Sequence, residues 1–106
     1  MDLPEAFRIE VQPDRDQVVV APHGELDIAT APRLAAEIDG LVERGVQRLV
    51  VDLRPTSFID STGLHVLLRE SARPDATISV LVGRTPVHRV FEIAGVRDIL
   101  HLEPAP

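Results

Sequence analysis

RLVVDL, residues 48–53, is a nearly continuous apolar run at the middle of the chain. Such a run predicts a strand that is buried on both faces, as in a parallel sheet covered by helices. Segments with helical spacing lie on both sides of it, and further strand-like segments follow them. Because strands alternate with helices, we predict an α/β fold with right-handed crossovers and a mixed, mostly parallel sheet of about five strands.

Three main helices are expected around this strand. The first begins near Thr30, a possible cap, and stops at Gly45. The second begins at Asp60 or Ser61 and ends at Pro74, and the third runs over residues 85–95. Residues expected to face inward are Leu34, Ile38, Leu41 and Val42 in the first helix, Leu64, Leu67, Leu68 and Ala72 in the second, and Val87, Val90, Phe91 and Ala94 in the third.

The N-terminal part of the chain predicts a β-hairpin. Residues 7–11 alternate between apolar and charged side chains, residues 13–16 form a turn, and a second strand covers residues 17–21 and continues or bends through 23–27. Further strands are expected at 77–82 and 99–102, with a short loop at 54–59. We expect a single domain over residues 1–106, of which 103–106 form a flexible tail.

Composition excludes several classes of function. The 106 residues carry a net charge of −6 and include no lysine and no cysteine. An acidic chain is a poor partner for nucleic acid, and the missing lysine excludes a lysine-bearing phosphate loop or a Schiff-base enzyme. Without cysteine, a signal peptide or a long apolar segment, the protein is expected in the cytoplasm, away from membranes.

FIDSTGL, residues 58–64, is the stretch with the most chemical content. It places two hydroxyls, Ser61 and Thr62, and Gly63 where a loop meets a helix N-terminus, where an added phosphate would be stabilised. From the residues alone, a simple helix cap by Asp60 or Ser61 is the favoured interpretation, although a capping residue can also accept a phosphate.

The segment IDSTGL resembles the motif of STAS domains, particularly the bacterial anti-sigma factor antagonists. Gly24-Glu25-Leu26-Asp27, followed by Thr30-Ala31, is similar to a second block of that family at the expected distance upstream. The expected order of strands and helices also matches, so the resemblance covers nearly the whole chain.

The resemblance implies a switch that binds proteins and is not itself an enzyme. In that family the unphosphorylated antagonist binds an anti-sigma factor that is also a serine kinase, and so releases the sigma factor. Phosphorylation of the serine after the aspartate, here Ser61 with Thr62 as the alternative, ends binding, and a serine phosphatase restores it. No cofactor or metal is implied, and a monomer or weak homodimer is expected. The implied partner-binding residues are Glu25, Asp27, Ile28, Thr30, Asp60, Ser61, Thr62, Gly63, Leu64 and His65.

His65 departs from the family pattern, in which many members carry glycine. It lies one helical turn after Ser61, so its imidazole could reach a phosphate there; an exposed helix residue is the simpler interpretation. A serine hydrolase is disfavoured because Ile59, not glycine, lies two residues before Ser61. Asp52 as a phosphoacceptor would need the lysine that the chain lacks. The remaining alternative is an unswitched STAS scaffold or sensor module that binds another protein.

Overall fold

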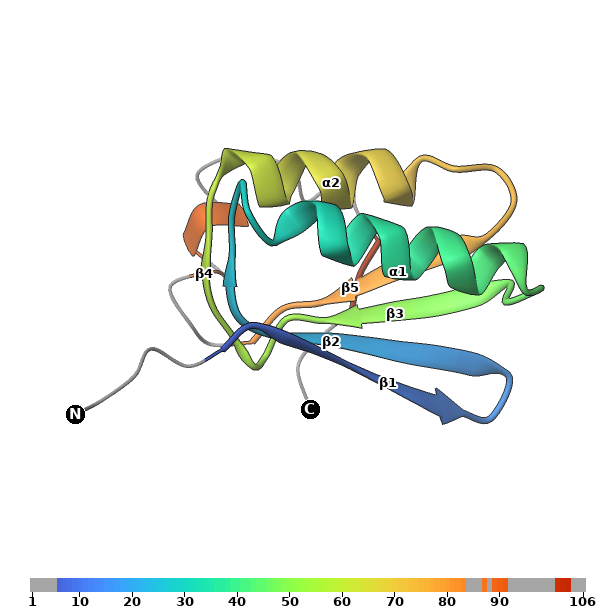
Figure 1. Cartoon of the computed structure of the whole chain (residues 1–106). Helices are drawn as coiled ribbons and strands as arrows, with labels where there is room; N and C mark the ends of the chain where they lie inside the picture. Colours follow the sequence, from blue (N-terminus) through green and yellow to red (C-terminus); the bar gives the residue numbers. More distant parts are fainter. Residues whose placement is uncertain (1–5, 84–86, 88, 92–100, 104–106) are drawn as a thin grey trace.

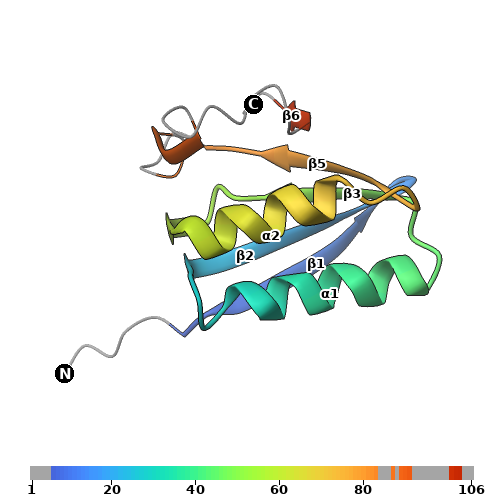
Figure 2. The ribbon, with the colours of Figure 1, turned by 90° about the horizontal axis from the view of Figure 1, so that it is seen from above.

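A computed structural model describes residues 6–83, 87, 89–91 and 101–103. Its elements are β1 (Arg8–Asp14), β2 (Gln17–Leu26), α1 (Ala31–Glu43), β3 (Arg48–Asp52), β4 (Thr56–Ile59), α2 (Ser61–Ser71), β5 (Thr77–Leu81) and β6 (His101–Glu103). Helices α1 and α2 lie side by side on one face of the sheet (Figures 1 and 2). The predicted α/β class is therefore confirmed.

The sheet runs in the order β1-β2-β3-β5-β6, and the short β4 pairs separately with the end of β2. Strands β1 and β2 form the predicted antiparallel hairpin, closed by a two-residue turn at Arg15 and Asp16. All other strand pairs are parallel. Strand β6 includes Glu103, which we expected in the tail, while residues 104–106 lie outside the described part of the chain.

The register of the parallel strands separates two faces of the sheet. Val20, Val51 and Val80 are neighbours in β2, β3 and β5, and all three are fully buried on the face that belongs to the main core. Val50, one residue away in β3, is 4% exposed although its side chain points to the opposite face. The prediction that RLVVDL is buried on both sides is thus confirmed.

Three expectations need correction. Residues 54–59 are not only a loop, because 56–59 form β4. Helix α2 ends at Ser71, before Pro74, because the chain turns at Ala72. Its inner face includes the buried Val66 and Glu70, whereas Ala72 is exposed. The last helical residue is Ser71, so Ala72 lies at the C-cap and is not part of the buried face.

The third predicted helix is described only in part. Val87 and residues 89–91 are helical, and Val87 and Phe91 are each 1% exposed in the core, as expected for inward-facing residues. Ala94 and Gly95 lie outside the described residues, as does the start of the predicted final strand at residues 99 and 100. Among the described helices, none has both the length and the apolar character needed to cross a membrane.

Candidate functional site

The loop between β2 and α1 is held by its own side chains. Asp27 Oδ1 accepts hydrogen bonds from the backbone N–H groups of Ala29, at 3.0 Å, and Thr30, at 3.1 Å. The Thr30 hydroxyl accepts from the Asp27 N–H at 2.9 Å and donates to the Glu25 carbonyl at 2.6 Å. Thr30 lies at the N-cap position, but its hydroxyl fixes this loop and makes no cap bond to α1, contrary to expectation. Its bonds leave the Ile28 side chain 76% exposed at the tip.

Strand β4 brings the second sequence block beside this loop. Glu25 pairs with Phe58 and Leu26 with Ile59 in the parallel β2–β4 ladder, and the Asp60 N–H donates to the Leu26 carbonyl at 3.2 Å. Paired residues of neighbouring strands project to the same face, so Glu25 and Phe58 are neighbours on the outer side. The two blocks that are separate in sequence thus form one continuous surface.

Asp60 starts α2 as its N-cap. Its Oδ1 accepts from the Gly63 N–H at 3.0 Å, and its carbonyl accepts from the Leu64 N–H at 3.0 Å. This cap makes Ser61 the first residue of the helix, and Ser61 is exposed. Gly63 is buried and Leu64 packs against the core, so these two residues hold the helix start in place from inside.

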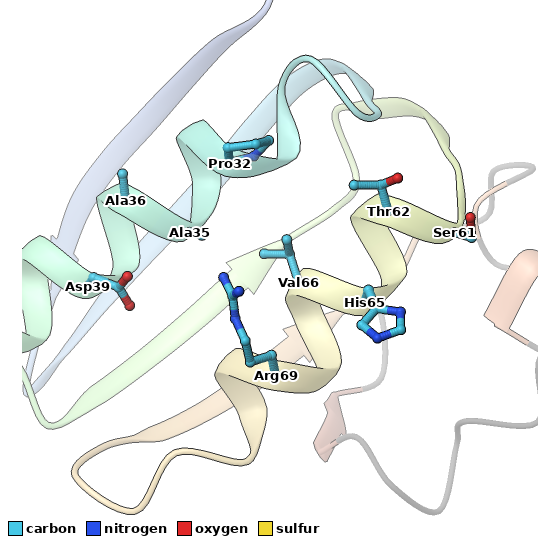
Figure 3. Close-up of a pocket in the computed structure, with 9 residues that line it drawn as sticks. All are labelled: Pro32, Ala35, Ala36, Asp39, Ser61, Thr62, His65, Val66 and Arg69. Atoms are coloured by element: carbon cyan, nitrogen blue, oxygen red, sulfur yellow. The ribbon is translucent and has the colours of Figure 1, made fainter.

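A cavity of about 600 Å³ lies between α1 and α2 (Figure 3). Ser61 and His65 are at its edge, on the side of α2 away from α1, whereas Thr62 and Val66 turn toward α1. Thr62 is half-buried and Ser61 exposed, so the serine is the more accessible hydroxyl. The residues lining this cavity are Pro32, Ala35, Ala36, Asp39, Ser61, Thr62, His65, Val66 and Arg69.

Phe58 was missed in the sequence analysis. Its side chain is 48% exposed, and Ser57 beside it lines a second cavity of about 340 Å³ with Glu25, Asp27 and Thr30. Phe7 lies at the edge of the same cavity and is covered by Arg33, whose Cζ is 4.9 Å from the ring centroid. The signal in the sequence is an aromatic residue directly before the IDSTGL motif, in a segment that we predict as a loop.

Asp52, the other acidic candidate, is already engaged by Arg54. Its carboxylate accepts from the Arg54 backbone N–H at 3.0 Å and from Nε and Nη2 at 3.0 and 2.9 Å. Burial alone would raise the pKa of Asp52, but the hydrogen bonds and charge of Arg54 outweigh it and hold that pKa below its usual value. Within the described part of the chain, no cluster of three or more potential metal ligands is present.

Comparison with known proteins agrees with this arrangement. The family model for the STAS domain matches residues 7–105. This chain belongs to the STAS domain family. The anti-sigma-B factor antagonist of Staphylococcus aureus is 32% identical over 82 residues, covering 74% of this STAS domain chain and 76% of the relative. The corresponding antagonist of Staphylococcus epidermidis is 30% identical over the same length.

Solved structures show the same fold. An anti-sigma factor antagonist from Mycobacterium paratuberculosis superposes with a TM-score of 0.86 at 25% identity, covering 99% of this STAS domain and 92% of that chain. The unphosphorylated form of the anti-sigma factor antagonist SpoIIAA superposes with a TM-score of 0.71 at 26% identity, covering 95% and 89%. The phosphorylated Bacillus SpoIIAA gives 0.65 at 25% identity, with 95% and 92% covered.

Proposed function

We propose that this STAS domain is an anti-sigma factor antagonist of the bacterial cytoplasm that acts by binding and carries no catalysis of its own. Unphosphorylated, it binds an anti-sigma factor that is also a serine kinase, and the sigma factor is released. The observation that carries the proposal is the exposed Ser61 at the start of α2, beside the Glu25–Thr30 loop, in a chain whose relatives are named antagonists.

Phosphorylation of Ser61 is the proposed off switch. The kinase transfers the γ-phosphoryl group of ATP to Ser61 Oγ, the bond to the leaving ADP breaks, and the hydroxyl proton passes to a base of the kinase. A solved structure of phosphorylated Bacillus SpoIIAA supports a phosphorylated state on this fold. The added charge of roughly −1.5 to −2 falls beside Asp60, on an acidic chain of net charge −6. A phosphatase restores the binding form.

The proposed binding surface is the exposed outer side of the two blocks. Ile28 and Phe58 are its exposed apolar residues, and Glu25, Asp27 and Asp60 supply carboxylates around them. Apolar anchors surrounded by polar groups are typical of the small set of residues that dominates binding energy. Weakening such a complex tenfold requires about 1.4 kcal/mol, which one misplaced phosphate can supply. The protein itself is proposed to be a monomer or a weak homodimer.

Mass spectrometry tests the switch directly. The protein is incubated with ATP and candidate serine-kinase anti-sigma factors, and intact mass and the modified residue are determined for wild type, Ser61→Ala and Thr62→Ala. We expect one phosphate on wild type and Thr62→Ala, and none on Ser61→Ala. Ser61→Ala should still bind the kinase. If active kinases bind the wild type yet leave it unmodified, the protein is an unswitched STAS scaffold or sensor module.

Phe58→Ala is expected to weaken kinase binding about tenfold, because an exposed aromatic side chain at the centre of an interface is a typical hot spot. Stability should change by no more than about 1 kcal/mol, since the side chain is 48% exposed. Isothermal titration calorimetry measures the affinity and thermal unfolding the stability. Val11→Ala is the matched control, because Val11 is 37% exposed on the hairpin, outside the proposed surface. Equal affinities of both variants would remove Phe58 from the interface.

A further inference from the structure

His65 is the residue of α2 that the proposed switch leaves without a role. It is exposed, and Figure 3 shows its imidazole on the same side of the helix as Ser61, away from α1. Among the described residues, His65 takes part in no ion pair. It is thus available for a group that appears only after modification.

The spacing suits a contact between a phosphate on Ser61 and this imidazole. Residues four apart on a helix have Cβ atoms roughly 5–6 Å apart, and a phosphoserine side chain is longer than serine by the phosphate group. The phosphate offers three strong acceptor oxygens, and a protonated imidazole carries two N–H donors. One of these donors within reach forms a charge-assisted hydrogen bond, which is stronger than a neutral one.

Within the described helices α1 and α2, the other charged side chains near Ser61 leave His65 as the natural partner of its phosphate. Asp60, just before Ser61, is negative and is bonded to the Gly63 N–H. Arg69 lies two helical turns from Ser61 and lines the cavity between the helices. Asp39 lines that cavity from α1, where Arg73 Nη1 holds it at 2.8 Å. Along the described α2, His65 is therefore the side chain with ring nitrogens that lies within one turn of the phosphoacceptor.

We infer that His65 receives the Ser61 phosphate and holds it along α2 through a charge-assisted hydrogen bond. This inference rests on the proposed function only in taking Ser61 as the phosphoacceptor. The contact turns the phosphate back onto the protein's own helix and adds a local bond to the helix start. A chain with glycine at position 65 cannot form this bond. The bond therefore stabilises the phosphorylated state of this protein relative to that of such a chain.

A phosphoserine placed at position 61 by genetic encoding tests the contact without any kinase. The second pKa of the phosphate is followed by ³¹P NMR in the otherwise wild-type protein and in the His65→Gln and Arg69→Gln variants. A nearby imidazolium favours the dianion, so we expect the phosphate pKa to rise by about half a pH unit in His65→Gln. Arg69→Gln, one turn further along, should shift it by no more than about 0.2 unit. Identical pKa values in wild type and His65→Gln would overturn the inference.

Thermal unfolding provides a second readout that a merely structural role of His65 would not change. Phosphorylation should raise the midpoint temperature of unfolding more in wild type than in His65→Gln. The difference between these two shifts measures the interaction between the phosphate and His65. Equal shifts would argue against the contact. If no kinase modifies Ser61 but the encoded phosphoprotein shows the coupling, the proposed function fails and the inference about His65 holds. If kinases do modify Ser61 and the coupling is absent, the proposed function holds and the inference about His65 fails.

Discussion

Replacing Arg73 by methionine is expected to lower the free energy of unfolding by about 2–4 kcal/mol at neutral pH. The Arg73 guanidinium bridges three carboxylates: Nη1 is 2.8 Å from both Asp39 and Glu70, and Nε is 2.7 Å from Asp75. Glu70 is the buried member, at 4% exposed, whereas the side chains of Asp39 and Asp75 are about half exposed. Methionine keeps the apolar bulk but removes the 2.8 Å partner of the buried Glu70, whose remaining ion pair among the described residues is the longer 3.8 Å contact with the exposed Arg69.

The loss should depend on pH in a defined direction. Burial raises the pKa of Glu70 above its ordinary value of 4.5, and Asp39 raises it further by hydrogen bonding and charge, while Arg73 opposes both. A raised carboxyl pKa means that the folded state holds the proton more tightly than the unfolded chain. This contribution to stability is complete below pH 4.5 and is lost as the pH rises through the folded-state pKa. Removing Arg73 removes the opposing effect, so the variant should lose stability more steeply with rising pH.

Urea unfolding followed by circular dichroism at pH 7 and at about pH 4.5 measures both effects, since the chain has no Trp or Tyr to serve as a fluorescent probe. The deficit of Arg73→Met should be smaller at the acid pH. Arg69→Met is the control on the same helix: Arg69 also approaches Glu70, at 3.8 Å, but its side chain is 66% exposed, so its loss should change the stability by no more than about 0.5 kcal/mol. Equal deficits of the two variants at pH 7 would show that the Arg73 cluster contributes no more than a surface pair.

The cluster also shows where sequence patterns stop being informative. Position 70 was not among the predicted inner residues of α2, because a glutamate in a helix normally indicates a solvated face. The cation that permits its burial comes from beyond the helix end, at Arg73, and helical spacing says nothing about where that side chain turns. Burial of Glu70 follows from a contact that only the folded chain contains.

The fold itself was predictable because its elements carry strong periodic signals. The buried run at residues 48–53 and the alternation at residues 7–11 each have a pattern that few other structures produce. Strand β4 has no such pattern, since its four residues are buried, exposed, exposed and buried. It pairs with the end of β2 where the register shifts between Gly24 and Glu25. Such irregular pairing gives no alternation to recognise, and Phe58 was missed with it.

The candidate site was predictable only as two separate blocks. The resemblance to STAS domains implied that the two blocks share one binding surface, but the β2–β4 pairing that brings them together was not predicted, because residues 54–59 were expected to form a loop. The role of Thr30 was also beyond the pattern: a threonine before a helix predicts a cap, yet its hydroxyl donates to the Glu25 carbonyl at 2.6 Å. Whether the hydroxyl bonds to the loop or accepts from an N–H in the first turn of the helix depends on loop geometry, which residue type does not determine.

Gly63→Ala is expected to destabilise the protein by about 2 kcal/mol net, combining a cost near 3 kcal/mol for overpacking with a gain of about 1 kcal/mol in helix propensity. A Cβ at position 63 would lie 2.7 Å from the Leu26 carbonyl oxygen and 2.8 Å from Ile59 Cγ1. The Leu26 carbonyl also accepts the Asp60 N–H at 3.2 Å, so it cannot move aside without disturbing the helix cap. The close approach of α2 to the end of β2 therefore requires glycine.

Gly40→Ala is the matched control within α1. A Cβ there meets nothing within 4 Å, so the same substitution should stabilise the protein by up to about 1 kcal/mol. Chemical unfolding of both variants gives the comparison, and kinase binding of Gly63→Ala adds a functional measure.

If Gly63→Ala were as stable as Gly40→Ala, the helix start would have to shift away from Leu26 at little cost. Ser61 would then be carried on a movable helix end, and its position beside the Glu25–Thr30 loop would not be fixed by the contact with β2. The opposite outcome is that Gly63→Ala loses stability and also binds the kinase more weakly under conditions where it is folded. Such a result would show that both the stability of the fold and the shape of the binding surface depend on the close contact between Gly63 and Leu26.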